Sequence, residues 1–320
     1  MRIETSVTRL LGVALPIVQA GMSWASSDAA LPLAVSRAGG LGVIAAGPMR
    51  PHDLERAIDE VRAGTDRPFA VNLPLYRKGA DEVMDLLAAK RVPILIASQG
   101  GPRRYLDRFH DVGTICLHVV ASTEHAAKTV DAGVDGLVVV GGEAGGHPPA
   151  SLVSTLIITR AVVRAARGTP VIASGGFADG AGLAAALALG AGAAQFGTRF
   201  LASREAAVHN SYKEAVLRAG IADSRTVGRD LGMIRALANT FTDRMTELEN
   251  AGADLEQRRV EFGKATLRAA ALDGDTTGGK LEAGQSAGLI DSVLPAGEIV
   301  RNLIEEYRTA RRALPEIYDF

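Results

Sequence analysis

The stretch GGEAGGHPP, residues 141–149, places His147 on a glycine-rich loop directly after the apolar run DGLVVV. Histidine titrates near neutral pH, so it can accept a proton from an acidic carbon or donate one to a carbanion. Glycines this dense either form a plain turn or let backbone approach a ligand closely. The stretch alone leaves both interpretations open. Within it, we expect Glu143 to brace the loop or cap the next helix rather than to react.

A second set of glycines has the pattern of a phosphate site. Gly175 and Gly176 follow the run PVIAS, and Gly197 and Thr198 follow the run AAQF. Successive backbone N–H groups and a hydroxyl can surround an anion, and a helix N-terminus adds a favourable dipole. A simple strand-to-helix turn also uses glycine, so one such loop would not distinguish the two cases. The two loops together predict a phosphate site.

Composition and charge exclude several classes of function. The chain has 320 residues, of which 47% are hydrophobic, and a formal net charge of −1. This balance lacks the basic footprint of a nucleic-acid-binding protein. No apolar run reaches the roughly 18 residues that a membrane span requires, and the N-terminal segment suits a first strand better than a signal peptide. We therefore expect a cytoplasmic protein with a small-molecule substrate, and we leave open whether it forms a homodimer.

No spacing typical of a metal or nucleoside triphosphate site is present. Cys116, the one cysteine, lies in an apolar run and excludes an internal disulfide or a thiolate cluster. The patterns H-E-x-x-H and G-x-x-x-x-G-K-[ST] are absent, so we predict no metal. Four other histidines lie within a strand or on charged helices and are expected to be structural: His52, His110, His118 and His125.

Eight short apolar runs alternate with amphipathic stretches between residue 16 and about residue 219. Apolar strands separated by helices indicate a parallel sheet covered by helices. Eight such units predict a closed (β/α)8 TIM barrel. A doubly wound sheet is disfavoured because the first turn, QAGMSWASSD, lacks a G-x-G-x-x-G fingerprint. The predicted strands are residues 16–21, 41–47, 69–75, 93–100, 115–121, 135–142, 170–176 and 193–200.

The pattern changes after residue 219. Residues 221–270 carry many charges with helical periodicity and no strand runs, which predicts a helical insertion or lid. Residues 1–220 and 271–320, with a final amphipathic helix, would then form the barrel. Loops after the carboxyl ends of barrel strands form the active face, so the glycine-rich loops are expected to converge there.

Several motifs together resemble the nitronate monooxygenase family, formerly the 2-nitropropane dioxygenase family. This family includes flavin-dependent enoyl-ACP reductases and NADH:quinone reductases. The motifs, in chain order, are PIVQAGM, AVSRAGGLGVIAAG, RPFAVNL, GGEAGGH, PVIASGGFADGAGLAAALALGA and GTRFLAS. The resemblance covers about residues 6–310 and implies an FMN-binding barrel, in which the cofactor carries the redox chemistry and the protein supplies position and electrostatics.

The resemblance also implies roles for particular residues. The FMN phosphate would lie on Gly175, Gly176, Gly197 and Thr198, and His147 would be the catalytic residue above the flavin ring. The ring would lie against the backbone that follows the first strand. The remaining expected flavin contacts are Ala20, Gly21, Met22, Asn72, Ala144, Gly145, Gly146, Ser174, Gln195 and Gln285.

Two activities of this family fit the sequence. The favoured one is a nitronate monooxygenase, which oxidises alkyl nitronates with O2 to a carbonyl compound and nitrite. The alternative is an NAD(P)H-dependent reductase of an enoyl thioester or a quinone. HNSYKEAVLRAG and GDTTGGKLEAGQSAGL resemble the flavin-type enoyl reductases, whereas Val119 stands where a lysine is expected in the quinone reductases. The intact His147 disfavours a third interpretation, a barrel that binds flavin without catalysis.

Four further residues carry weaker expectations. Trp24 and Tyr76 follow predicted strands, so they form a substrate wall or simply pack. Lys280 lies near a glycine-rich return of the chain and is expected to be exposed to solvent. Pro149 stands where relatives commonly have glycine, and it should stiffen the loop of His147.

Overall fold

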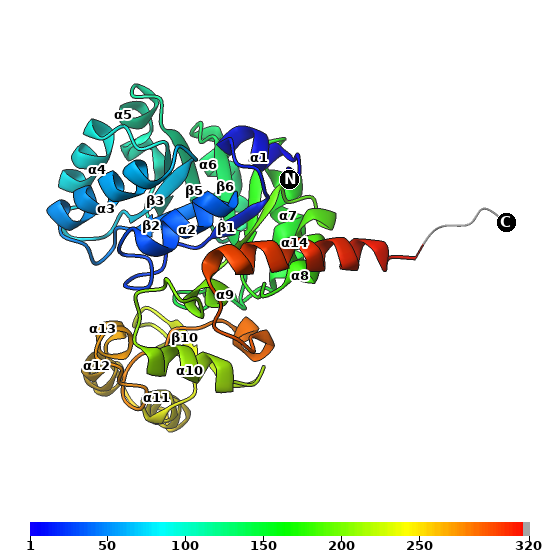
Figure 1. Cartoon of the computed structure of the whole chain (residues 1–320). Coiled ribbons are helices and arrows are strands. Elements are labelled where there is room, and N and C mark those ends of the chain that lie inside the picture. Colours follow the sequence, from blue (N-terminus) through cyan, green and yellow to red (C-terminus); the bar gives the residue numbers. More distant parts are fainter. Residues whose placement is uncertain (316–320) are drawn as a thin grey trace.

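Eight strands form a barrel in the computed structural model of the chain, which describes residues 1–315 (Figure 1). They are β1 (Ile17–Gln19), β2 (Gly42–Ala45), β3 (Phe69–Pro74), β4 (Ile94–Ser98), β5 (Ile115–Val120), β6 (Gly136–Val140), β7 (Val171–Ser174) and β8 (Ala193–Phe196). Neighbours are parallel, in the order β1-β8-β7-β6-β5-β4-β3-β2. A parallel bridge between Val18 and Leu41 joins β1 to β2, so the ring closes. The predicted TIM barrel is confirmed.

Amphipathic helices cover the outside of the barrel. In the helix over residues 51–64, the buried residues Leu54, Ala57, Ile58 and Val61 recur every three to four positions, which gives one apolar face. The outer helices are α2 (Ala30–Ala38), α3 (Pro51–Gly64), α4 (Ala80–Ala89), η1 (Pro102–Arg104), α5 (Leu106–His110), α6 (Thr123–Asp131), α7 (Thr155–Ala165) and α8 (Gly180–Ala188). In the described part of the chain, no helix combines the length and the apolar character that a membrane span requires.

Two short helices differ from the sequence-based expectations. The segment before β1 contains α1 (Ser6–Leu11), whose first turn is capped by the Thr5 hydroxyl. The strand predicted over residues 193–200 is too long, because β8 ends at Phe196 and α9 (Thr198–Leu201) follows. The carbonyl of Gly197 accepts the N–H groups of Phe200 and Leu201, which starts the helix directly after the strand.

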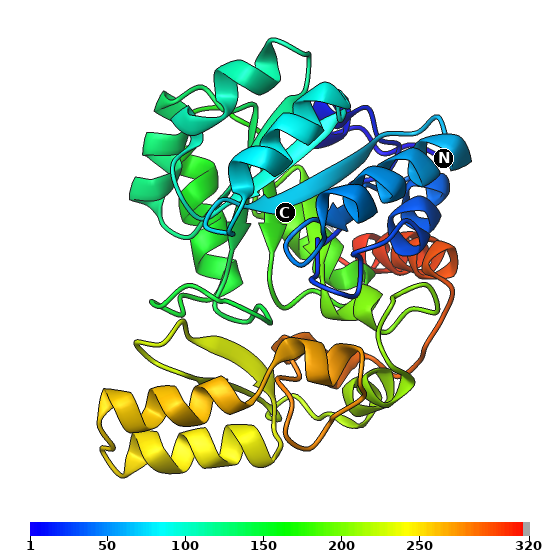
Figure 2. The same ribbon diagram turned by 90° about the vertical axis from the view of Figure 1, so that its left-hand side faces the viewer.

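A second lobe lies beneath one end of the barrel (Figures 1 and 2). It contains α10 (Asn210–Arg218), β9 (Ser224–Val227), β10 (Ile234–Leu237), α11 (Thr240–Asn250), α12 (Leu255–Lys264), α13 (Leu267–Ala271) and η2 (Gln285–Leu289). The expectation that residues 221–270 hold no strand is wrong, since β9 and β10 pair antiparallel. The strand β9 reads SRTV and buries only its first and last residues, so it has no apolar run to detect. That residues 221–270 act as a lid stays a prediction.

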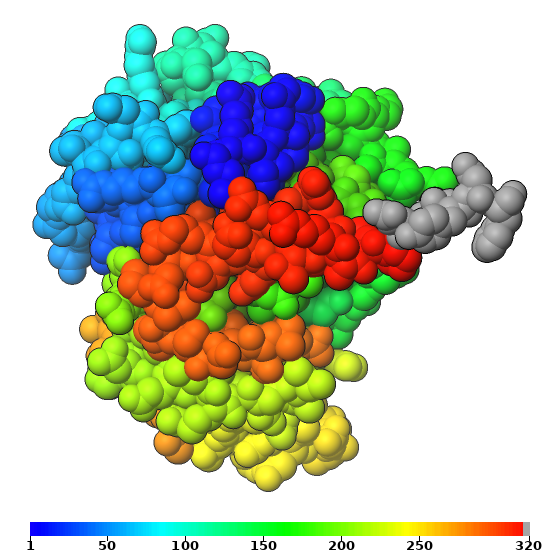
Figure 3. Space-filling view, turned by 45° about the vertical axis from the view of Figure 1, so that its right-hand side comes forward, coloured from blue at the N-terminus to red at the C-terminus, as the bar shows by residue number. Residues whose placement is uncertain are grey.

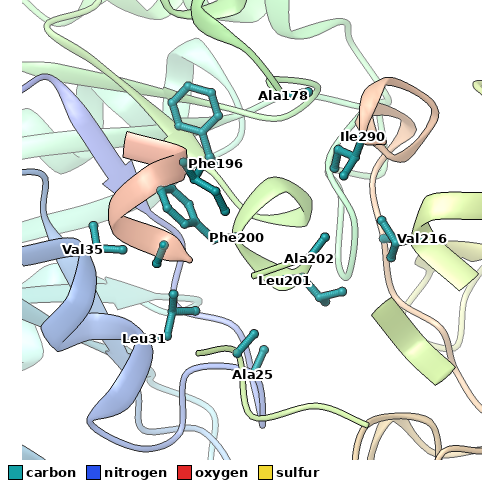
Figure 4. Packing of buried hydrophobic residues seen from close by; sticks show 14 of the residues in the cluster. Ala25, Leu31, Val35, Ala178, Phe196, Phe200, Leu201, Ala202, Val216 and Ile290 are labelled. Atoms are coloured by element: carbon teal, nitrogen blue, oxygen red, sulfur yellow. The ribbon is translucent and has the colours of Figure 1, made fainter. Parts of the chain in front are cut away.

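The chain returns to the barrel as α14 (Ala296–Arg312), which lies across its side (Figure 3). This helix packs closely on α8 at Gly180, where a Cβ would meet the backbone nitrogen of Tyr307 at 2.1 Å. One apolar cluster joins the two lobes: Phe200 comes from the barrel side, and Val216 and Ile290 come from the second lobe (Figure 4). Shared packing therefore holds the second lobe against the carboxyl end of the barrel.

Candidate active site

A cavity of about 1200 Å³ lies where the second lobe faces the carboxyl ends of the barrel strands. The loops after all eight strands contribute to its wall, and so do residues from β10 to η2. All predicted site residues line this cavity except Asn72 and Gln285. Trp24 and Tyr76 line it too, in agreement with the substrate-wall interpretation. We call this space the main cavity.

The loops after β7 and β8 present a set of unpartnered donors. Gly175 and Gly176 have φ angles of 111° and 74°, a left-handed conformation that favours glycine. Within residues 1–315, no protein acceptor takes the backbone N–H groups of Gly175, Gly176, Gly197 or Thr198. The Thr198 hydroxyl accepts the N–H of Gly284 at 3.0 Å, which leaves its own hydrogen free to donate. These donors fit a phosphate group.

The loop after β1 forms a floor that only glycine permits. A Cβ on Gly21 would lie 2.6 Å from the Cβ of Asn72. Asn72 therefore lies beneath this floor, and its side-chain amide donates to the Ile96 carbonyl at 3.0 Å. On the opposite side, the Gln195 amide donates to the Ser174 hydroxyl at 2.9 Å, and both residues line the main cavity. The floor leaves space for a flat ring, but Asn72 is not brought to that space.

Gln285 is the second predicted flavin contact that lies outside the main cavity. It begins η2, its side chain is exposed, and its backbone N–H donates to the Glu143 carbonyl at 3.1 Å. Its neighbours Gly284 and Ser286 line the cavity instead. The segment around Gln285 therefore contributes Gly284 and Ser286 to the cavity, while the Gln285 side chain turns outward.

The loop that carries His147 is fixed at its base by Glu143. One carboxylate oxygen of Glu143 accepts the backbone N–H of Thr155 at 2.8 Å and its hydroxyl at 2.6 Å. Thr155 is the first residue of α7, so the expectation that Glu143 caps the next helix is confirmed. Further along, a Cβ on Gly145 would lie 2.5 Å from the backbone of Ala283, so the loop is wedged against the second lobe.

Arg235, on β10, holds the same loop from the other lobe and was missed by the sequence analysis. Its buried guanidinium donates twice to the Gly142 carbonyl, at 3.1 and 2.9 Å, and once to the Ser224 carbonyl at 2.9 Å. Its backbone also exchanges two hydrogen bonds with Gly146, at 2.7 and 3.2 Å. An arginine inside the apolar run MIRAL was the available signal, because a buried arginine needs fixed acceptors.

We expect Arg235→Met to lower the free energy of unfolding by about 2–4 kcal/mol, because it leaves two buried carbonyls without a donor. Urea unfolding of the flavin-bound protein measures this change. Arg225→Met is the matched control: Arg225 lies on the neighbouring strand, is exposed and pairs with Asp243, so its loss should cost less than about 1 kcal/mol. Equal losses in the two variants would contradict the role assigned to Arg235.

Three titratable side chains face the main cavity near this loop. Lys280 is not solvent-exposed as expected; it is half-buried, and its ammonium lies 3.4 Å from the centre of the Phe262 ring. Burial lowers the pKa of Lys280 and raises the pKa of Glu282 to about 7. The pKa of His147 is lowered by partial desolvation first and by the charge of Lys280 second. In all three groups the shift of the pKa favours the uncharged form, and perturbed pKa values of this kind are typical of functional sites.

Glu282 should make stability depend on pH. Its folded pKa of about 7 lies above the ordinary value of 4.5, so between these values the native state binds more protons than the unfolded state. The free energy of unfolding therefore falls as pH rises through this window. Glu282→Gln should flatten this fall in a series of thermal midpoints, whereas Glu256→Gln, on the exposed helix α12, should not. An unchanged slope in Glu282→Gln would contradict the shifted pKa.

One group of potential metal ligands lies away from the main cavity. Side-chain atoms of His110, Cys116 and Asp135 come within 4.8 Å of one another. One carboxylate oxygen of Asp135 is already within 3.0 Å of His110 Nε2 and accepts the Cys116 N–H at 2.7 Å. Burial raises the pKa of the Cys116 thiol to about 12, which disfavours the thiolate that a metal would need. The absence of a metal site stays a prediction.

Unpartnered backbone donors after β7 and β8, a glycine floor after β1 and the loop of His147 after β6 meet in one cavity of a TIM barrel, an arrangement that suits a flavin-dependent oxidoreductase. The chain belongs to the nitronate monooxygenase family, whose model, described as "Nitronate monooxygenase", matches residues 4–85 and 77–306. The arrangement of unpartnered donors and floor described above agrees with that assignment.

Relatives in this family have different activities. The chain is 32% identical to (3aS,4S,5R,7aS)-5-hydroxy-7a-methyl-1-oxo-octahydro-1H-indene-4-carboxyl-CoA dehydrogenase of Mycobacterium tuberculosis, over 95% of this chain and 96% of that protein. It is 33% identical to a nitronate monooxygenase of Paraburkholderia phytofirmans, over 93% and 94% of the two chains. The solved structure of FabK from Thermotoga maritima is 40% identical, with a TM-score of 0.90 over 97% of this chain and 98% of that one. The specific reaction is therefore not decided by family membership.

Proposed function

We propose that this chain is an FMN-dependent oxidoreductase that acts on the α,β-carbons of an acyl thioester. The observation that carries this proposal is the size of the main cavity. At about 1200 Å³ it exceeds the roughly 300–1,000 Å³ of a pocket for one drug-sized ligand, so a long substrate fits beside a flavin. The similarity to a carboxyl-CoA dehydrogenase and the segments that resemble flavin-type enoyl reductases support the same choice.

FMN fits the donors and the floor of the main cavity. The N–H groups of Gly175, Gly176, Gly197 and Thr198 would hold the phosphate, and the backbone around Gly21 would lie against the ring. When bound, FMN supplies a reversible hydride acceptor and donor at the β-carbon of the substrate. The protein's part is to orient the substrate, keep water away and move the accompanying proton.

His147 is the group that would move this proton. A thioester carbonyl makes the hydrogen on the α-carbon acidic, and a neutral imidazole can accept it. The lowered pKa keeps His147 neutral at neutral pH, which suits removal of the proton. Oxidation would then take the α-proton to His147 and a hydride from the β-carbon, giving an α,β-unsaturated thioester. Reduction would return both, with NAD(P)H as the source of hydride.

Nitronate oxidation, the activity favoured by the sequence, is the second candidate. The carbon beside a nitro group is also acidic, so a neutral His147 could remove its proton in the same way. The 33% identity to a nitronate monooxygenase over most of both chains supports this candidate.

A comparison of products separates the two candidates. We expect the FMN-loaded protein to consume NADH or NADPH when an enoyl-CoA is supplied anaerobically, and to release little nitrite from propyl nitronate in air. Nitrite release without any turnover of thioesters would overturn the thioester proposal in favour of the monooxygenase. Protein that takes up no FMN would overturn the proposals of both activities.

A further inference from the structure

A second cavity of about 720 Å³ adjoins the main cavity. Tyr76 and Gln99 line both cavities, so the two spaces meet at these residues. The second cavity runs outward between the loop after β4 and the helix α6. We call it the side groove. Its wall combines apolar surface from Leu75 and Pro102 with several cationic side chains. A ligand could therefore extend from the main cavity into the side groove.

The cations of the side groove are not all neutralised. Arg104 pairs with Asp81 at 2.8 Å. Arg103 and Lys128, however, form no ion pair within residues 1–315, and both line the groove. The single carboxylate of the wall, Asp131, is paired with Arg167 outside it. Lys128 also interacts electrostatically with Glu124 of the same helix, yet the groove is lined by three cationic side chains and one carboxylate, so its wall attracts anionic ligands.

The positive charge of the side groove also acts on a residue of the main cavity. His125 lines the main cavity, and its pKa is lowered by burial first and by the charge of Lys128 second. Lys128 is thus close enough to act on a side chain of the neighbouring space. A ligand with a reactive end at His147 and an anionic end beside Lys128 would be attracted along one continuous path.

The junction of the two cavities has a fixed shape. Gln99 and Gly100 have φ angles of 57° and 103°, so the loop turns through the left-handed region. His118, fully buried, lies 3.1 Å from the Gly100 carbonyl through Nε2 and 2.9 Å from the Tyr105 hydroxyl through Nδ1. Burial lowers the pKa of His118 to about 4, so the neutral ring donates from Nε2 and accepts at Nδ1. A wall fixed before binding lowers the entropic cost of holding a ligand.

We propose that the side groove binds the phosphorylated adenosine end of a nucleotide-bearing ligand whose reactive end lies in the main cavity. Arg103 and Lys128 would pair with the phosphates, and the exposed ring of Tyr76 would pack against the adenine. Both CoA thioesters and NAD(P)H carry such an end. The proposal rests on the proposed function for the identity of these ligands, and the apolar wall argues for an adenosine group over a bare inorganic anion.

Calorimetric titration of the FMN-loaded protein with CoA, pantetheine and NADPH tests this proposal. The double variant Arg103→Glu/Lys128→Glu should weaken binding of CoA, NADPH or both by about tenfold or more, and should leave pantetheine unchanged. The control Arg108→Glu/Arg244→Glu makes the same change of charge at exposed residues outside the groove and should have little effect. Loss for CoA alone identifies a thioester subsite, and loss for NADPH alone identifies a subsite for the reductant.

Three outcomes would overturn the proposal: equal losses in both double variants, unchanged binding in the groove variant, or no binding of CoA or NADPH by the unaltered protein. Activity is read separately. Suppose that pantetheine thioesters and CoA thioesters are turned over equally well, and that the groove variant does not change either rate. This result would leave the proposed function intact and contradict the role assigned to the side groove. Binding of CoA that depends on Arg103 and Lys128, without turnover of any thioester, would support the side groove as a binding site and contradict the proposed function.

Discussion

We expect His147→Ala to lower turnover by about 10²–10⁴-fold, the usual contribution of a positioned general acid or base. His147 lines the main cavity on a loop held by Glu143 and Arg235, and within residues 1–315 its own side chain forms no hydrogen bond or ion pair. The variant should therefore keep its FMN and its thermal midpoint. The lost proton transfer would appear as a fall in kcat at saturating substrate, measured by stopped flow under anaerobic conditions.

The pH profile gives this prediction a second readout. Because the pKa of His147 is lowered from 6.5, the acidic limb of kcat/KM for proton removal should lie below pH 6.5 in the unaltered protein and disappear in the variant. His52→Ala, on the exposed surface of α3, serves as the control and should leave both rate and profile unchanged. Turnover in His147→Ala that stays within a few-fold of the original would remove this histidine from the mechanism.

Gly175→Val should abolish stable FMN binding. Gly175 has a φ of 111°, which a β-branched residue does not adopt without strain, and a Cβ there would lie 2.8 Å from the Thr155 hydroxyl. The loop would shift, and the N–H groups of Gly175 and Gly176 would no longer point at the phosphate. Losing two charge-assisted hydrogen bonds corresponds to about 3–6 kcal/mol, or at least a hundredfold weaker binding. Flavin fluorescence during titration with FMN measures the affinity.

Gly133→Val separates backbone strain from loss of the phosphate site. Gly133 also has a positive φ, 93°, but a Cβ there meets nothing within 4 Å, and it lies outside the main cavity. This control should lose stability and keep its affinity for FMN. If Gly175→Val also kept its affinity, the phosphate would have to lie elsewhere in the main cavity.

Local patterns along the chain predict the barrel and most of its active face. Each strand is a short apolar run, and each glycine loop directly follows one, so position after a strand is enough to place His147, Gly175 and Gly197 on the same face. Two predicted flavin contacts do not line the main cavity, because of the direction of their side chains. Asn72 lies at a strand end as expected, yet it turns toward the Ile96 carbonyl beneath Gly21. Gln285 turns outward from a short helix.

The contributions of the second lobe depend on long-range docking, so a local pattern such as the arginine inside MIRAL can mark a buried residue but cannot identify its partner. Arg235 contacts Gly142 across 93 positions of sequence, and this contact exists only when β10 lies against the barrel. Lys280, in the loop after α13, is half-buried because its ammonium lies over the ring of Phe262 on α12. Charged residues are normally exposed, so the sequence predicts an exposed Lys280. The many charges and helical periodicity of residues 221–270 likewise predict a helical lid, although this segment contains two strands.

The central claim, flavin chemistry on an acyl thioester, is tested most directly by a single anaerobic turnover. The FMN-loaded protein is reduced with stoichiometric dithionite, mixed with crotonyl-CoA or octenoyl-CoA, and followed by the visible absorbance of the flavin. We predict that the absorbance returns to its oxidised level without oxygen, and that a saturated thioester forms in equal amount. A flavin that stays reduced with both thioesters and is reoxidised only when air is admitted would contradict the claim.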